Sequence, residues 1–257
     1  MIKLPRTLHI EGSRLKQGQT DPEAVQFSKL AGEFLYVEEK LDGTGVSIFF
    51  DEQFVPQIWH RGSQATSKEF RQLHEWVDSH QDQLFDLLED RYVLFGEWML
   101  HKHTIFYDRL PSYFLESDIY DRKNDLWLST FARDSLLSGQ NYINSVPVLA
   151  AFKPTRLSQL TDMIRQPLYQ SDDWREHLWH RCEMMGLNLE KILKQSDPSD
   201  LSEGLYIKHE DQDKVIGRYK YVRYEFVNFI VNSGSHVMDR EPVHNISVGG
   251  YESSCLS

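Results

Sequence analysis

Glu38-Glu39-Lys40-Leu41-Asp42-Gly43-Thr44-Gly45 lies between two segments that are rich in aromatic and β-branched residues. Residues 34–40 and residues 45–50 have the composition of strands, and Asp42-Gly43 is a typical pair for a tight turn. We therefore predict two strands joined by a tight turn. Lys40 then lies at the rim of a sheet, where a rigid element holds its side chain and leaves it accessible.

Lys40 is a candidate nucleophile at this rim. An amine attacks phosphorus only when it is neutral, and burial or neighbouring cations lower the pKa of a lysine toward 7. The sequence offers three such cations: Arg218 and Lys220, two residues apart in a later strand-like segment, and Arg61. The alternative is a solvated lysine at a strand end beside two glutamates, and the local sequence leaves both interpretations open.

The rest of the chain divides into strand-like and helix-like segments without repeats or heptads. Periodicity predicts strands over residues 92–98, 112–120, 205–209 and 214–222, and helices over residues 66–90, 155–165, 172–185 and 224–232. Thr66 and Glu69 match a capping box at the start of the first helix. Residues 129–198 are predicted to form a helical insert, and strands on both sides of it favour an α+β domain.

The composition is that of a globular protein, with 257 residues, 40% hydrophobic and 26% charged. A net charge of −11 argues against broad, non-specific nucleic-acid binding but allows a local basic groove. No apolar run approaches the roughly 18 residues needed to span a membrane. The first residues lack the apolar core of a signal peptide, and two cysteines, Cys182 and Cys255, make no disulfide framework. We expect a cytoplasmic protein.

Two histidines, His101 and His103, share one face if their segment is extended, and such a pair could bind a metal. We favour two surface histidines. The sequence contains neither of the common phosphate-binding loops, Gly-x-x-x-x-Gly-Lys-Ser/Thr or Gly-x-Gly-x-x-Gly. Nucleotide chemistry must therefore depend on other residues.

Lys40-Leu41-Asp42-Gly43 resembles the nucleotidyl-acceptor motif of the covalent nucleotidyltransferases, which include RNA ligases, ATP-dependent DNA ligases and mRNA capping enzymes. Five further segments resemble the other motifs of these enzymes, in the same order along the chain. They are His60-Arg61-Gly62, Leu94-Phe95-Gly96-Glu97, Phe114-Leu115-Glu116-Ser117-Asp118-Ile119-Tyr120, Glu203-Gly204-Leu205-Tyr206-Ile207-Lys208 and Arg218-Tyr219-Lys220-Tyr221. Each match alone is weak, but six ordered matches make the resemblance strong.

Gly43-Thr44-Gly45 is similar to the Gly-Thr-Asn that follows the lysine motif in RNA ligases, whereas DNA ligases and capping enzymes place an arginine soon after it. The chain is identified as a member of the ATP-dependent RNA ligase family, of the small, stand-alone bacterial or phage type. This implies an α+β nucleotidyltransferase (ATP-grasp-like) domain over residues 1–257, with antiparallel sheets flanked by helices and a helical insert at about 129–198. The segment after Lys220 is too short for an OB-fold domain, so we expect none.

The resemblance also implies roles for single residues. Lys40 takes AMP from ATP, while Arg218 and Lys220 stabilise the charge that develops on the α-phosphate. The ATP-binding residues would be Glu39, Lys40, Arg61, Glu97, Ser117 and Lys220. Glu203 and Asp118 would hold Mg²⁺ (or Mn²⁺), which prefers oxygen ligands and keeps part of its water shell.

The implied reaction is RNA repair: a 5′-phosphate and a 3′-hydroxyl are joined through lysyl-AMP, with an RNA end-healing enzyme as a candidate partner. Two residues depart from the family pattern. Ser117 replaces a phenylalanine that stacks on adenine, a loss on the order of 1 kcal/mol, and Gly45 replaces the Asn. The alternatives are a DNA nick ligase of the same superfamily and a non-catalytic module that binds nucleotides or RNA ends.

Overall fold

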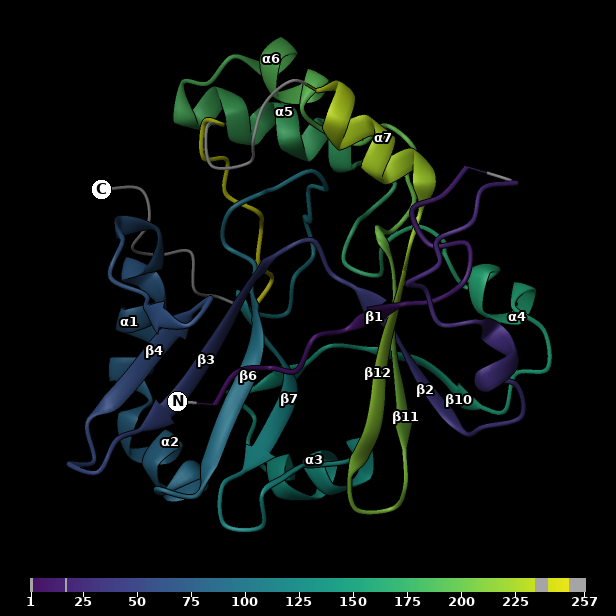
Figure 1. Ribbon diagram of the computed structural model, residues 1–257. Helices are drawn as coiled ribbons and strands as arrows, with labels where there is room; N and C mark the ends of the chain where they lie inside the picture. Colours follow the sequence, from purple (N-terminus) through teal and green to yellow (C-terminus); the bar gives the residue numbers. More distant parts are fainter. Residues whose placement is uncertain (1, 17, 234–239, 250–257) are drawn as a thin grey trace.

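Two sheets, both mostly antiparallel, form the centre of the fold (Figure 1). The computed structural model describes residues 2–16, 18–233 and 240–249. The first sheet has the order β1-β12-β11-β2-β10, with bounds Leu8–His9, Val215–Val222, Gly204–Glu210, Leu35–Lys40 and Val148–Phe152. The second has the order β5-β4-β3-β6-β7-β8, with bounds Ser63–Gln64, Pro56–His60, Thr44–Phe50, Tyr92–Trp98, Phe114–Asp121 and Leu126–Trp127, and β9 (Asn144–Ser145) pairs with β7. The predicted α+β class is confirmed.

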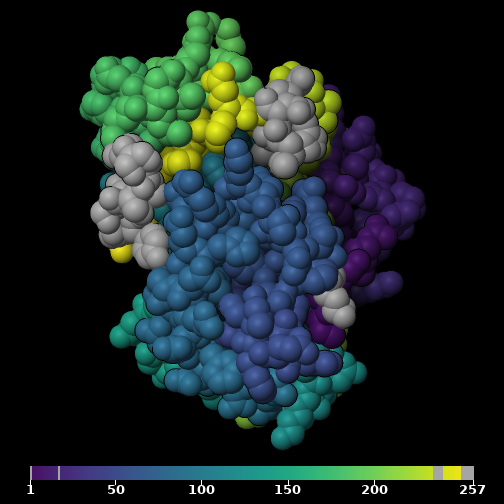
Figure 2. Space-filling view, turned by 90° about the vertical axis from the view of Figure 1, so that its left-hand side faces the viewer, coloured from purple at the N-terminus to yellow at the C-terminus, as the bar shows by residue number. Residues whose placement is uncertain are grey.

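Helices flank both sheets (Figure 1). The α-helices in the described ranges are α1 (Arg71–Ser79), α2 (Gln81–Leu88), α3 (Thr130–Leu137), α4 (Ser158–Thr161), α5 (Trp174–Met185), α6 (Leu189–Lys194) and α7 (Tyr224–Asn232). Two short 3-10 helices are η1 (Phe27–Lys29) and η2 (Lys68–Phe70). Figure 2 shows the face built by β3 to β6 and α1–α2 (blue), with α5 and α6 (green) above it. In the described part of the chain, no helix has the length and apolar character that crossing a membrane requires.

The connection between β2 and β3 carries the chain from one sheet to the other. Both strands were predicted, but the prediction that a tight turn pairs them with each other was wrong. β2 is paired on both sides, with β10 and β11, and β3 lies between β4 and β6. Leu41 is buried at the crossing, and the Asp42 carboxylate accepts hydrogen bonds from the backbone N–H groups of Thr104 (2.6 Å) and Ile105 (2.9 Å). These hydrogen bonds fix the segment between β2 and β3 in a conformation that is not a hairpin turn.

The helix predicted over residues 66–90 is divided into η2, α1 and α2. The capping box does not form, because no side chain caps η2 and the Ser67 hydroxyl donates to the Glu69 carboxylate instead (2.9 Å). The break falls at His80, whose backbone N–H still bonds to Trp76 and Val77. Apolar side chains of both helices are buried against the outer face of the second sheet, as the periodicity predicted.

The predicted helical insert is only partly helical. Residues 129–198 contain α3, α4, α5 and α6, and α5 matches the prediction for 172–185 closely. The helix predicted over 155–165 is reduced to the four residues of α4. The segment also supplies β10, which pairs with β2 at the edge of the first sheet. The prediction was wrong here because Val148 to Phe152 form an apolar run too short to be told apart from a helix by periodicity.

Buried ion pairs connect the facing sides of the two sheets. Arg133 of α3 is 1% exposed and donates to Glu38 of β2 (3.2 Å) and to Glu116 of β7 (2.8 Å). Lys208 of β11 is fully buried and also donates to Glu38 (2.8 Å) and to the carbonyl of Ser117 (2.6 Å). Paired charges can be buried in this way because each is hydrogen-bonded. Cys182 is a buried free thiol, and Cys255 lies outside the described residues.

Candidate functional site

Lys40 is the last residue of β2, and its amine meets the carboxylate of Glu203, the residue before β11. The two strands are in register with Gly204 opposite Lys40, so Glu203 is placed beside the lysine. The distance from Lys40 Nζ to Glu203 Oε1 is 2.8 Å, and the two side chains are 25% and 11% exposed. The structure thus places Lys40 at a sheet rim, held but accessible, as the sequence indicated.

The charge state of Lys40 differs from the prediction. Burial acts to lower the pKa of this lysine, but the carboxylate of Glu203, with Glu97 and Asp42 behind it, outweighs burial and raises the pKa. The predicted depression by neighbouring cations was wrong, because carboxylates surround the amine more closely than cations do. In the protein without nucleotide, Lys40 is therefore a protonated, paired amine.

Glu97 approaches the lysine from the second sheet. It lies on β6 opposite Gly45 of β3, and burial raises the pKa of its carboxyl to about 7. A side chain at Gly43 would meet Met99 Sδ at 2.4 Å and the Glu97 carboxylate at 3.3 Å. A side chain at position 43 would therefore displace the Met99 side chain. A side chain at Gly45 would make only an ordinary contact with Glu97, at 3.8 Å.

Two connected cavities extend along the groove from Lys40. The first, of about 200 Å³, is lined by Lys40, Glu97, Ser117 and Lys220, and the second, of about 310 Å³, continues past Ser117 to Arg61. Leu4 lines both cavities. The N-terminal segment that carries Leu4 crosses in front of the two sheets before it reaches β1 (Figure 1). All six predicted ATP-binding residues line these two cavities, Glu39 included.

Ser117 occupies a bulge in β7. Phe95 pairs with Asp118 and Gly96 pairs with Glu116, so Ser117 is the extra residue between them. Its carbonyl accepts from Lys208 and Arg133, which fixes the bulge. The small side chain lines both cavities, and the apolar residues that line them with it include Phe95 of β6, Trp59 of β4 and Leu4.

Lys220 and Arg218 share one face of β12 but have different surroundings. Lys220 lines the cavity with Lys40, and burial together with the Lys40 charge lowers its pKa. Arg218 is instead 7% exposed and donates to Asp118 (2.9 Å), with its guanidinium over the ring of Trp127 (4.4 Å). Direct contact of Arg218 with the phosphate near Lys40 is therefore not supported, because its donors already have a buried partner.

Glu39 has its side chain on the opposite face of β2 from Lys40. Its carboxylate accepts from the backbone N–H of Leu168 (2.9 Å), and burial raises its pKa to about 7. Strand alternation produces this arrangement. Glu39 can therefore reach the groove only through its main chain.

The predicted metal pair, Glu203 and Asp118, is not brought together. Glu203 pairs with Lys40, whereas Asp118 pairs with Arg218 and Lys208. Within residues 2–16, 18–233 and 240–249, no group of three His, Cys, Asp or Glu side chains is arranged to hold a metal. The carboxylates that do gather near Lys40 are Glu203 and Glu97, with Asp42 close by.

Asp42 and His103 were missed as site residues. Asp42 acts on Lys40, and His103 lies near it, with Nδ1 3.7 Å from the Asp42 carboxylate and Nε2 3.2 Å from the Thr44 hydroxyl. Burial acts to lower the pKa of His103, but Asp42 outweighs it and the pKa is raised. His101 and His103 were predicted at the surface, yet both are partly buried. The only sequence signal was that Asp42 belongs to the lysine motif itself.

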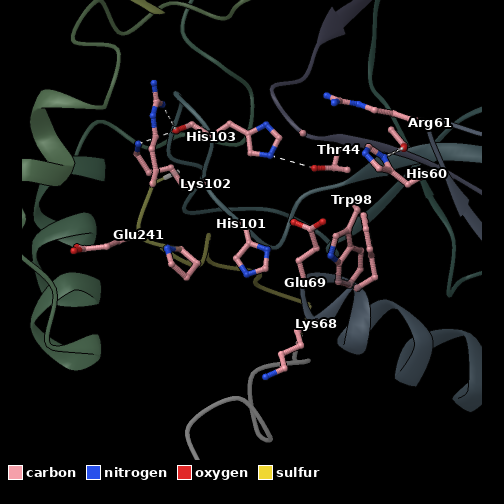
Figure 3. Close-up of a pocket in the computed structure, with 15 residues that line it drawn as sticks. Thr44, His60, Arg61, Lys68, Glu69, Trp98, His101, Lys102, His103 and Glu241 are labelled. Atoms are coloured by element: carbon pink, nitrogen blue, oxygen red, sulfur yellow. Dashed lines mark hydrogen bonds between the residues drawn. The ribbon is translucent and has the colours of Figure 1, made fainter. Parts of the chain in front are cut away.

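A larger cavity, of about 660 Å³, opens on the other side of Gly43, Thr44 and Gly45. Figure 3 shows His101, Lys102 and His103 on one side of it and His60, Arg61 and Trp98 on the other. It shares Gly45 and Arg61 with the groove. Residues 101–103, which follow β6, and residues 240–242 therefore line the same cavity as the lysine motif.

The family model for RNA ligase matches residues 33–222, which include all six motifs. The chain belongs to the RNA ligase family. The match covers both sheets except for β1, together with the groove between them. A comparison with curated protein sequences finds no significant match.

Solved structures of an RNA ligase from Naegleria gruberi have the same fold. A mutant with ATP and Mn matches with a TM-score of 0.54 and 15% identity, over 79% of this chain and 53% of that one. The enzyme with PPi matches with a TM-score of 0.53 and 15% identity, over 88% and 61%. A mutant with AMP and Mn has a TM-score of 0.53 and 15% identity, over 86% and 60%. The chain thus spans between half and two thirds of the length of these proteins.

Proposed function

We propose that the protein is an ATP-dependent RNA ligase that takes AMP from ATP onto Lys40 and passes it to a 5′-phosphate RNA end. The position of Lys40 carries this proposal. The amine ends a buried strand inside a groove, with Glu203 at 2.8 Å, Glu97 facing it from the second sheet, and Lys220 lining the same cavity. Membership of the RNA ligase family supports ATP and RNA as the substrates.

The first step forms a bond between Lys40 Nζ and the α-phosphorus of ATP and breaks the bond to pyrophosphate, which leaves. Lys40 must first lose a proton. The Glu203 carboxylate already accepts a hydrogen bond from the amine, and burial raises the pKa of this carboxyl, which makes it a suitable proton acceptor. The ion pair that raises the pKa of Lys40 thus also supplies the route by which it becomes neutral.

Other groove residues bind and orient the nucleotide. Lys220, which lines the cavity with Lys40, would stabilise negative charge on the α-phosphate, and Glu97 would accept hydrogen bonds from the ribose. Adenine would rest against the wall at Ser117, with Glu39 contributing its main chain. Arg218 acts as a positioning residue, because it fixes Asp118 behind the groove.

The carboxylates beside Lys40 fit a divalent cation. Burial raises the pKa of both Glu97 and Glu203, and a cation would relieve the cost of keeping two buried carboxylates ionised. Glu203, with Asp42 nearby, would hold Mg²⁺ or Mn²⁺ together with phosphate oxygens of the nucleotide, while Glu97 would contact the ribose. When bound, such an ion neutralises the triphosphate and acts as a Lewis acid.

In the later steps AMP moves from Lys40 to a 5′-phosphate, and a 3′-hydroxyl displaces AMP to join the RNA. Ends of this kind arise from breaks, so the proposed process is RNA repair, in cooperation with an enzyme that heals RNA ends. The acidic net charge of −11 means that contacts with RNA are confined to local basic surfaces.

The deciding experiment follows the transfer of labelled AMP to protein. With ATP and Mg²⁺, the wild-type chain is expected to form a covalent AMP adduct on Lys40 that is labile in acid and stable in alkali, as a phosphoramidate is, and that is located by mass spectrometry. Lys40→Ala should form none, while Lys123→Ala, at an exposed turn, should label as the wild type does. Tight ATP binding without an adduct would favour a non-catalytic module. Sealing rates on RNA, DNA and hybrid nicks then separate RNA from DNA ligation.

A further inference from the structure

The 660 Å³ cavity beside the lysine motif is not used by the nucleotide chemistry described above. It begins at Gly43, Thr44 and Gly45, directly after the groove that holds Lys40, and it is separated from the smaller cavities by this segment. Its volume lies in the range of cavities that bind small ligands and is large enough for a nucleotide. Lys40 itself does not line this cavity, but a group bound there would contact Gly43, Thr44 and Gly45 of the same motif.

Positive charge gathers around this cavity although the chain is acidic. Its walls contain four Lys or Arg side chains, Arg61, Lys68, Lys102 and Arg240, against two glutamates, Glu69 and Glu241. Arg61 and Lys68 are exposed and form no ion pair with another described residue. Such cations are available to a ligand that carries negative charge.

The positive charge of the inner wall is fixed in place. Lys102 is 7% exposed and donates to the carbonyls of His103 (3.2 Å) and Gln195 (3.1 Å). Arg240 donates to the same two carbonyls, at 3.0 and 3.3 Å. Two basic side chains thus converge on one pair of carbonyls behind the cavity, and the Arg240 guanidinium supplies the permanent positive charge of this wall. Burial lowers the pKa of Lys102 to about 7, so an anion nearby would favour its charged form.

Trp98 provides a second, independent observation, a hydrogen-bond donor at the wall of this cavity that is unpartnered within the described chain. This residue lines the cavity, is 4% exposed, and its indole N–H has no hydrogen-bond partner among the described residues. Buried donors in folded proteins nearly always have an acceptor. Because an indole N–H can only donate, the missing partner is an acceptor such as a phosphate oxygen.

We propose that this cavity is a phosphate-binding subsite, in which Trp98 and Lys68 bind a phosphate group of a substrate beside the lysine motif. This rests on the proposed RNA ligase function for the identity of the substrate. The phosphate belongs to the 5′ end of RNA or to the polyphosphate of ATP, since both present the same acceptor oxygens. The subsite places that phosphate on the side of the lysine motif opposite the adenine groove.

The test compares the affinity of the protein for a 5′-phosphorylated RNA oligonucleotide and for the same oligonucleotide with a 5′-hydroxyl, by fluorescence anisotropy. Trp98→Phe keeps the ring and removes the N–H. Lys68→Ala removes a charge at the rim, Lys68→Arg restores it, and Lys123→Ala removes an equal charge elsewhere. In parallel, the KM for ATP in Lys40 adenylylation is measured for every variant.

We expect the wild type to prefer the 5′-phosphate. Trp98→Phe should reduce this preference about tenfold and Lys68→Ala about threefold, while the Arg and control variants keep it. A rise in the KM for ATP in the same variants, with the preference unchanged, would support the subsite and assign the phosphate to ATP. If neither quantity changes in either variant, the proposal is overturned. Because binding is measured without catalysis, a protein that forms no adduct still gives an answer, and Lys68, being exposed, avoids a folding defect.

Discussion

At the scale of residues, the charge on Lys40 depends on which neighbours are close. The sequence suggested that cations would lower the pKa of the amine, but the nearest charges are carboxylates and the pKa is raised. A partner at 2.8 Å acts more strongly than a cation farther along the sheet, because Coulomb energy falls with distance. Glycine 43 shows the same dependence on close contacts, since Met99 and Glu97 leave no space for a side chain.

The substitution Gly43→Ala tests this packing. Its methyl group would lie 2.4 Å from Met99 Sδ and 3.3 Å from Glu97, so the buried Met99 side chain must move and Glu97 must shift slightly. We expect Lys40 adenylylation to slow by at least tenfold, since small displacements of reacting groups are costly. Gly45→Ala, where the space is open, serves as the control and should retain most of the rate. Equal rates in both variants would contradict the packing argument.

Because the carboxyl of Glu39 is buried, we expect the stability of the protein to depend on pH. Burial raises the pKa of this carboxyl from 4.5 to about 7, so the folded chain holds this proton where the unfolded chain has lost it. The free energy of unfolding should therefore fall as the pH rises from about 4.5 to 7, and then level off. Glu39→Gln should remove this part of the fall, on the order of 1 to 3 kcal/mol. Urea unfolding at pH 5 and pH 8 measures it, and exposed Glu52→Gln should leave the fall unchanged.

At the scale of elements, the strands around the site were predictable because alternation and composition mark them locally. β6 and α7 match their predicted bounds. β2, β3 and β12 differ by one residue at one end, and β11 is longer by one residue at each end. The partners of these strands were not predictable, because pairing depends on residues far apart in sequence. β10 and the role of α3 were missed for this reason: Arg133 of α3 contacts Glu38 and Glu116, which lie in different sheets.

Arg133 should therefore be important for stability. Replacing it with Met leaves the buried carboxylates of Glu38 and Glu116 with one cation fewer, and breaking a buried ion pair from one side costs about 3–5 kcal/mol. Urea unfolding of Arg133→Met measures the loss. The matched control is Asp134→Ala, the exposed neighbour on the same helix, which should change stability by less than about 0.5 kcal/mol. A loss below 1 kcal/mol in Arg133→Met would be inconsistent with the bridge.

At the scale of the whole molecule, the site exists because two sheets face each other and the N-terminal segment crosses the groove between them (Figure 1). Leu4 lines both groove cavities, and Ile2 packs beside Phe95, near the small side chain of Ser117. The N-terminal segment thus brings apolar side chains to the position at which the resemblance to RNA ligases implies a phenylalanine, and we propose that it supplies part of the wall against which adenine rests.

The variant Leu4→Ala tests whether the N-terminal segment contributes to this apolar wall. Removing about three carbons of apolar wall should raise the KM for ATP in Lys40 adenylylation roughly threefold to tenfold, with a smaller change in kcat. Leu8→Ala on β1, where the side chain is 39% exposed, is the matched control and should leave KM unchanged. A lower KM in Leu4→Ala would instead indicate that the segment obstructs the groove.

The sequence by itself determined the six motifs, the family and the elements that carry the motifs, because each is written in consecutive residues. It also determined that Lys40 ends a strand. Only the tertiary structure decided that β2 and β3 belong to different sheets, that Glu39 faces away from Lys40, and that Arg218 is occupied by Asp118. The crossing at Asp42 and the cavity at Trp98 likewise depend on contacts between distant segments. Such contacts are selected by packing of the whole chain, which local propensities do not encode.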